Sequence, residues 1–169
     1  MAAQRDQILT RLGSYWKLEA VNVITVPAFL CWMASKYGGV GWASALALGA
    51  VAFLLVIGAA YWHAKNRQLH GQPGLPKTLR YLARLRLPAL VWTSVALAAA
   101  AVVQLRPDLA ASAGDRWVAL AAAVLAGLEY VNYYHRQLQH FDNVADIKRL
   151  LTGRGFRRSQ MARDLERYS

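Results

Sequence analysis

A stripe of polar and ionisable side chains marks the last third of an apolar segment that runs from residue 117 to residue 140. Its members share one helical face, at about 100° per residue, and they are Glu129, Asn132, Tyr133, Arg136 and His140. Because lipid does not tolerate such groups without partners, the stripe has two interpretations. We favour the structural one, in which Glu129 pairs with a neighbouring helix and holds the helices in register. The functional alternative is a groove that handles protons or binds a ligand. Candidate partners for Glu129 are Asn22, His63, Lys65 and Arg67.

Histidines at the ends of two apolar segments suggest a second kind of chemistry. His63 and His135 end two predicted spans on the same side of the membrane, so they would suit axial ligation of a haem from two helices. His135 and His140 diverge by about 140° on an ideal helix, which disfavours a shared metal ion. We therefore predict no cofactor and no metal site. The alternative is a haem- or metal-binding redox or ligand-binding protein that uses His63, His135 and Glu129.

The composition favours a membrane protein. Of the 169 residues 56% are hydrophobic, yet 20 Lys and Arg face only 9 Asp and Glu, for a net charge of +11. The basic residues lie between long apolar runs and no nucleic-acid motif accompanies them, so they indicate anionic lipid and not nucleic acid. Cys31 is the only cysteine, which excludes a disulfide framework. No cleaved signal peptide and none of the common hydrolase, metalloprotease or nucleotide-binding motifs is expected.

The apolar runs predict an all-α, polytopic membrane protein with four transmembrane helices. The expected spans are about residues 19–36, 43–62, 87–105 and 117–135. Short connections would pair them as two antiparallel hairpins, most simply a four-helix bundle, within a transmembrane domain over residues 1–140. Ala119, Ala123 and Gly127 repeat every four residues and predict close packing of the last span.

Two flanking segments are predicted to lie at the membrane surface. Residues 3–18 read as a short amphipathic helix before the first span, which Pro27 should kink. Residues 77–86 read as a basic interfacial helix leading into the third span. Its arginines are the predicted contacts for lipid headgroups, namely Arg80, Arg84 and Arg86.

Residues 141–169 form a predicted basic, helical tail. Asp142 or Asn143 would cap a first helix, and Ser159 would cap a second. If the tail binds a protein partner, its apolar contacts and steering charges are expected to be Phe156, Met161, Leu165, Arg157, Arg158 and Arg163. The tail is also expected to be removable without unfolding the spans.

The charge distribution predicts the orientation. Lys36, Arg106 and Arg116 lie in the two short loops on one side, and the other 17 of the 20 Lys and Arg lie on the opposite side. The positive-inside rule then places both termini in the cytoplasm, with the protein in the inner (plasma) membrane. The function that follows is a non-enzymatic one: an interaction, scaffold or accessory subunit that acts through its cytoplasmic face, with anionic lipids and a protein as partners.

Overall fold

The computed structural model describes residues 2–138 and 156–168, and describes side chains from residue 16 onward. The regular structure of the described residues is helical, which confirms the predicted all-α class. The elements are α1 (Ala2–Ser35), α2 (Trp42–Leu69), α3 (Leu75–Leu105), the 3-10 helix η1 (Pro107–Leu109), α4 (Ala113–Tyr134) and α6 (Gln160–Tyr168). The predicted cap at Asp142 or Asn143 and the residue His140 lie outside the described residues.

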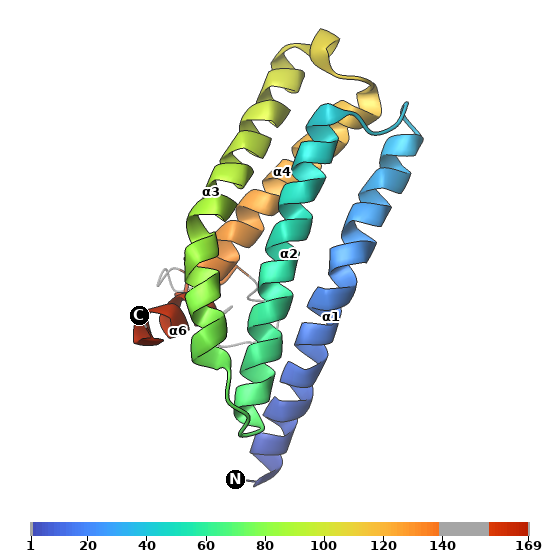
Figure 1. The fold of residues 1–169 in the computed structure, drawn as a ribbon. Helices are drawn as coiled ribbons and strands as arrows, with labels where there is room; N and C mark the ends of the chain where they lie inside the picture. The colour runs from blue at the N-terminus through green and yellow to red at the C-terminus, as the bar shows by residue number, and fades with distance from the viewer. Residues whose placement is uncertain (1, 139–155, 169) are drawn as a thin grey trace.

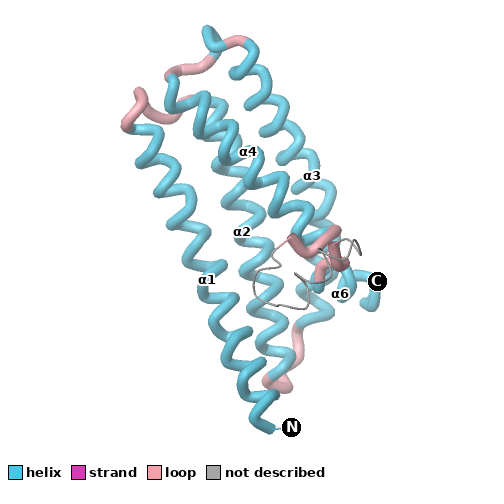
Figure 2. The backbone as a smooth tube through the Cα atoms, turned by 180° about the vertical axis from the view of Figure 1, so that it is seen from behind, coloured by secondary structure: helices cyan, strands magenta, loops and turns pink. Residues whose placement is uncertain are grey.

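Four long helices lie side by side and alternate in direction (Figure 1). Helices α2 and α4 form the centre, because each packs against the other and against both α1 and α3. The view from behind shows α4 crossing this centre (Figure 2). The start of α1 and the loop between α2 and α3 lie at the bottom of Figure 1, and α6 lies above them beside the lower part of α3; we call this lower part of the molecule the basic end. Residues 36–41 and 106–112 form the opposite, far end.

The helices are longer than the predicted spans. Residues 3–18 do not form a separate helix, because α1 runs without interruption from Ala2 to Ser35 with Pro27 inside it. The basic segment 77–86 and the third span are likewise one helix, α3, which continues through Pro88. Helix α2 extends seven residues past the predicted end at residue 62. Polar extensions of apolar helices thus project beyond the apolar zone at the basic end.

Small residues allow the central helices to approach closely. Four alanines of α4 are fully buried, namely Ala119, Ala122, Ala123 and Ala126. The buried small-residue face therefore contains the predicted Ala119 and Ala123, and it also includes Ala122 and Ala126. Gly127 is only partly buried and faces Leu97 of α3. Without long side chains in the way, backbones pack at short range through dispersion contacts.

Two glycines of α2 receive aromatic side chains from neighbouring helices. A Cβ at Gly49 would lie 2.7 Å from the Trp92 ring, whose Nε1 donates to the Leu46 carbonyl at 3.1 Å. A Cβ at Gly58 would overlap the Tyr133 hydroxyl. Both positions therefore require glycine if the aromatic rings are to keep their places.

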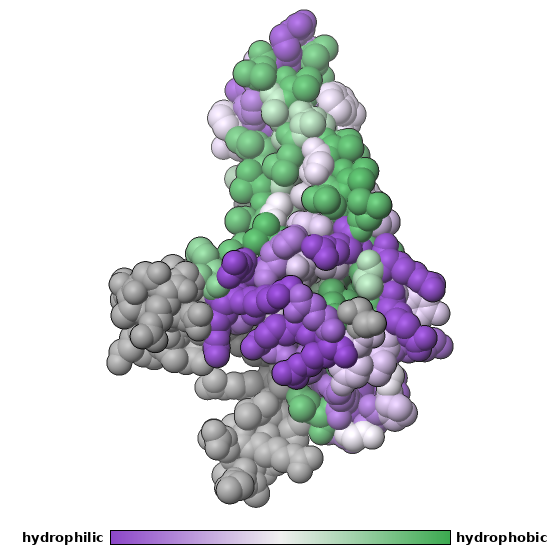
Figure 3. Space-filling model, turned by 90° about the vertical axis from the view of Figure 1, so that its left-hand side faces the viewer, coloured by the Kyte–Doolittle hydropathy of each residue, from purple (hydrophilic) through white to green (hydrophobic). Residues whose placement is uncertain are grey.

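The surface above the basic end is apolar. Large hydrophobic side chains are exposed on the outer helices, among them Ile24 (73%), Phe29 (58%), Leu87 (66%) and Val91 (53%). Figure 3 shows apolar residues over the upper part of this face and polar residues gathered below them. Three helical stretches are long and apolar enough to cross a membrane: Trp16–Ser35, Trp42–Leu69 and Leu75–Leu105. Helix α4 does not meet the same measure, so three membrane-crossing helices are supported by length and composition.

Candidate functional site

The candidate site lies at the basic end, where the C-terminal segment returns to the long helices. An antiparallel bridge joins Arg136 to Arg158, with the Gln137 N–H donating to the Arg157 carbonyl at 2.9 Å. Ser159 follows, and its hydroxyl accepts from the Ala162 N–H at 3.1 Å, which confirms the predicted cap of α6. The same hydroxyl donates to the Tyr133 carbonyl at 2.6 Å. One serine thus starts α6 and ties it to α4.

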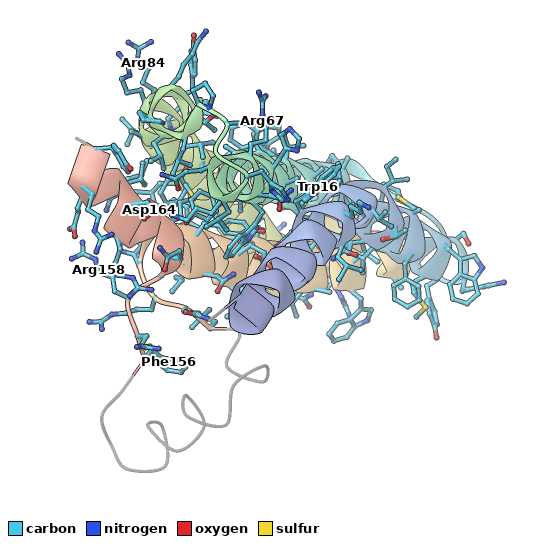
Figure 4. The ribbon with its side chains drawn as sticks, turned by 90° about the horizontal axis from the view of Figure 1, so that it is seen from below. Trp16, Arg67, Arg84, Phe156, Arg158 and Asp164 are labelled. Atoms are coloured by element: carbon cyan, nitrogen blue, oxygen red, sulfur yellow. The ribbon has the colours of Figure 1, made fainter. Side chains whose placement is uncertain are left out.

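A buried acid anchors α6 to α2. The Asp164 carboxylate accepts from the Tyr61 hydroxyl at 2.8 Å and from Lys65 Nζ at 2.7 Å. Asp164 and Tyr61 are each 1% exposed, whereas the Lys65 side chain keeps 17% of its surface accessible. Figure 4 shows Asp164 on the inner side of α6, while Arg158 projects outward. A buried carboxylate needs such partners, so the contact fixes how α6 sits.

This docking changes the interpretation of the residues that were expected to contact a partner protein. Met161 is 2% exposed and belongs to the same hydrophobic core as the long helices, so it is not available to a partner protein. Leu165 is partly buried against that core, whereas Phe156 remains 42% exposed. Tyr61 and Lys65 of α2 take a buried acceptor from this segment, so the expectation that it can be removed without unfolding the long helices stays a prediction.

The docked segment completes a basic pocket of about 560 Å³. Its polar lining comes from α3, from the end of α4 and from the docked segment: Arg86, Tyr134, His135, Arg136, Arg158 and Glu166. Among these described lining residues three are arginines and one is a carboxylate. Arg158 forms an ion pair with Glu166, and Arg136 Nη1 donates to the Phe156 carbonyl at 3.0 Å.

The three arginines predicted to contact headgroups separate into two environments. Arg86 lines the basic pocket. Arg80 and Arg84 line a smaller neighbouring hollow of about 140 Å³ between α3 and α6, together with Leu165 and Tyr168. All three arginines are exposed. Arg86 therefore belongs to the basic pocket, whereas Arg80 and Arg84 belong to the neighbouring hollow.

Two carboxylates lie beside the Tyr133 hydroxyl, where α1, α2 and α4 meet. The hydroxyl donates to Glu19 Oε2 at 3.1 Å. Glu129 is the second acid next to it, with its Oε2 buried and without a hydrogen-bond partner. Gly58 leaves room for the tyrosine at this point. Because one hydroxyl carries one proton, it satisfies only one carboxylate at a time.

Tyr133 lies next to Glu129, where the sequence analysis expected a partner such as Lys65 or Arg67. Lys65 is engaged with Asp164, and Arg67 Nε donates to Gln72 at 2.9 Å. Within the predicted stripe, Tyr133 is brought to Glu129, while Asn132 Oδ1 accepts from the Leu138 N–H at 2.9 Å. Arg136 belongs instead to the basic pocket. The stripe is thus divided between two sites.

The two histidines considered for haem lie against different neighbours. The His63 ring meets the Trp16 ring of α1 edge-on, with centroids 5.0 Å apart. The His135 ring lies 5.6 Å from the Tyr130 ring and lines the basic pocket. Within residues 16–138 and 156–168, no group of three or more His, Cys, Asp or Glu side chains could hold a metal ion.

The far end contains a buried acid that sequence reasoning did not single out. Asp115 Oδ1 accepts from the Ser44 hydroxyl at 2.7 Å and from the Ser44 N–H at 2.8 Å, which caps the start of α2 from another helix. Ser112 caps α4 by accepting from the Asp115 N–H at 2.9 Å, and donates to the Gly39 carbonyl at 2.8 Å. A Ser-x-x-Asp pattern preceding an apolar run is the signal in the sequence that could have found this cap.

Hydrogen bonds hold the pKa of Asp115 below its ordinary value. Burial of the carboxylate works in the opposite direction, but the hydroxyl and N–H of Ser44 and two further backbone N–H groups outweigh it. The charged form of Asp115 is therefore the form that joins the two loops of the far end.

No protein-family description matches the chain, and no match was found among curated proteins or solved structures.

Proposed function

We propose that the chain is a four-span protein of the inner membrane with both termini in the cytoplasm. Exposed aromatic residues at the far end support this proposal: Trp32, Tyr37, Trp42 and Trp117. Trp16 and Trp62 lie toward the basic end. From Trp16 to Trp32 an α-helix rises about 24 Å, and from Trp42 to Trp62 about 30 Å, which suits a hydrocarbon core of about 30 Å.

Helix α4 is the proposed fourth span because of its neighbours. It packs against α1, α2 and α3. From Trp117 to Tyr134 it rises about 26 Å, between the values of about 24 Å and 30 Å for α1 and α2. Its two acids lower its apolar character, but Asp115 is buried at the far end and Glu129 faces Tyr133. Packing of α4 along three candidate spans supports the proposal that it crosses the membrane with them.

The proposed activity is non-enzymatic: the protein is an interaction or accessory subunit that acts through its basic end. The observation that carries this proposal is the anchoring of α6 by Asp164, since it holds exposed arginines in fixed positions at the edge of the apolar surface. Arg157, Arg158 and Arg167 are exposed there, whereas the far end carries few charges. Fixed positive charge near a membrane favours anionic lipid and steers acidic protein partners.

Site-specific photo-crosslinking in native membranes tests this proposal. A photoreactive side chain is placed at Arg167 on the basic end, and a matched one at Leu109 on the far end, both exposed. We expect a discrete protein adduct at residue 167 that weakens when Arg157 is changed to Glu, and no such adduct at residue 109. Equal adducts at both positions, or none at 167, would contradict the proposal.

The absorption spectrum separates this proposal from haem or metal chemistry. We expect the detergent-purified protein to be colourless and free of stoichiometric metal. A Soret band that disappears in His135→Ala would replace the interaction role with a redox one. A haem held from two helices needs both rings, so His63→Ala would abolish the same Soret band.

A further inference from the structure

We propose that the basic pocket binds the phosphate headgroup of an anionic phospholipid whose acyl chains lie along the exposed face of α3. This inference rests on the proposed membrane location and names the ligand class of the basic end. Three arginines and one carboxylate among the described lining residues give the pocket a net charge of +2. A headgroup with about two negative charges complements it.

The pocket has the size and donors that a phosphate group needs. Its volume of about 560 Å³ lies within the usual range of about 300–1,000 Å³ for small-molecule sites. Arginine guanidinium groups donate in a planar fork that matches phosphate oxygens. Arg86 lines the pocket from α3 and is exposed, so its guanidinium is accessible to a phosphate there.

The position of the pocket selects a lipid over a soluble phosphate. Ala83 and Arg86 line it from α3, and one turn further along the same helix the surface becomes apolar. Leu87 is 66% exposed, Leu90 41% and Leu97 39%. Arg86 and Leu97 are separated by about 16 Å along the helix, close to half of a bilayer core of about 30 Å. Figure 3 shows apolar surface directly above the polar patch on this side.

Native mass spectrometry of the full chain tests the proposal. The protein is purified from nanodiscs of neutral phosphatidylcholine with either phosphatidic acid or cardiolipin, and the fraction that retains anionic lipid is measured. Arg86→Gln is expected to lower that retention about fivefold, as loss of one interfacial arginine predicts. Arg67→Gln is the matched control, because Arg67 is also exposed but lies outside both hollows.

A second variant changes retention in the opposite direction. Glu166→Gln removes the only carboxylate among the described lining residues and frees Arg158, so retention of anionic lipid is expected to rise. Inorganic phosphate at about 10 mM is expected to leave the bound lipid in place, because it lacks the chains that contact α3. The proposal is overturned if Arg67→Gln and Arg86→Gln lose lipid equally, if Glu166→Gln leaves retention unchanged, or if inorganic phosphate displaces the lipid.

These outcomes are independent of the proposed membrane topology. Reporter fusions that confirm the topology, together with equal losses in the two arginine variants, would reject the pocket alone. A C-terminus outside the cell would reject the proposed orientation, whatever the lipid measurements give.

Discussion

The Asp164 carboxylate lies 2.8 Å from the Tyr61 hydroxyl, which joins two buried residues 103 positions apart in the chain. Through this contact the C-terminal helix becomes part of the fold of the long helices. Lys65 adds a positive charge to the same carboxylate, at 2.7 Å. Because α6 is anchored to α2 in this way, the arginines of the basic end have defined positions.

The first prediction concerns this anchor. Asp164→Asn removes the negative charge that accepts hydrogen bonds from Lys65 and Tyr61. We therefore expect a loss of about 2 kcal/mol in the free energy of unfolding and faster hydrogen exchange in α6. Thermal unfolding in detergent and hydrogen–deuterium exchange measure the two effects. Glu166→Gln is the control, because its ion pair with Arg158 is about half exposed and contributes little. Identical exchange in both variants would show that Asp164 does not anchor α6.

Local sequence signals predicted where helices form better than they predicted which residues contact one another between helices. Ser159 was identified as a cap because capping depends on residues within one turn. The partner of Asp164 could not be found this way, since Lys65 and Tyr61 are about a hundred positions distant and nothing in helical spacing relates them. Glu19 was treated as the edge of a span for the same reason, although it shares Tyr133 with Glu129. The expected boundaries near residues 19 and 87 followed the change from charged to apolar residues, but α1 and α3 each continue through that change as one helix.

The second prediction concerns pH and the far end. The pKa of Asp115 is lowered in the folded protein, so its contribution to stability is complete above the unfolded pKa of about 4 and is lost as the pH falls through the folded value. Asp115→Asn should lower stability by about 2 kcal/mol at pH 7, with a difference from wild type that shrinks below about pH 4. Unfolding midpoints measured from pH 3 to pH 7 show the trend.

Asp108→Asn is the matched control for that series. Asp108 pairs with Arg106 in the same region, but both side chains are more than half exposed. We expect its unfolding midpoints to follow those of the wild type at every pH. A constant difference between wild type and Asp115→Asn across the series would rule out the charged carboxylate as the group that joins the loops.

The third prediction concerns the two acids beside Tyr133. Glu19→Gln and Glu129→Gln each remove one of two neighbouring like charges, so each should raise the melting temperature near neutral pH. The double variant should gain less than the sum, with a coupling of about 1 kcal/mol. Additive gains would mean that the two carboxylates do not interact. Glu166→Gln again reports the effect of removing an exposed acid.

The fourth prediction concerns Gly58. A methyl group there overlaps the Tyr133 hydroxyl, so Gly58→Ala should displace the ring and lower stability by about 1–3 kcal/mol. Combining it with Tyr133→Phe removes the overlapping atom and should recover part of the loss. Gly71→Ala is not a suitable control because its φ is +76°, whereas Gly127 has only a contact at 3.7 Å and should tolerate alanine. No recovery in the double variant would contradict the proposed overlap.

The location of the C-terminus tests the central claim most directly, because four spans and three spans place it on opposite sides. Reporter fusions are made after residue 169 and within the loops at Gly39, Gly74 and Gly114. The four-span account predicts cytoplasmic signals at 74 and 169 and external signals at 39 and 114. A cytoplasmic signal at 74 with an external signal at 169 would mean that α4 does not cross the membrane, and would contradict the account.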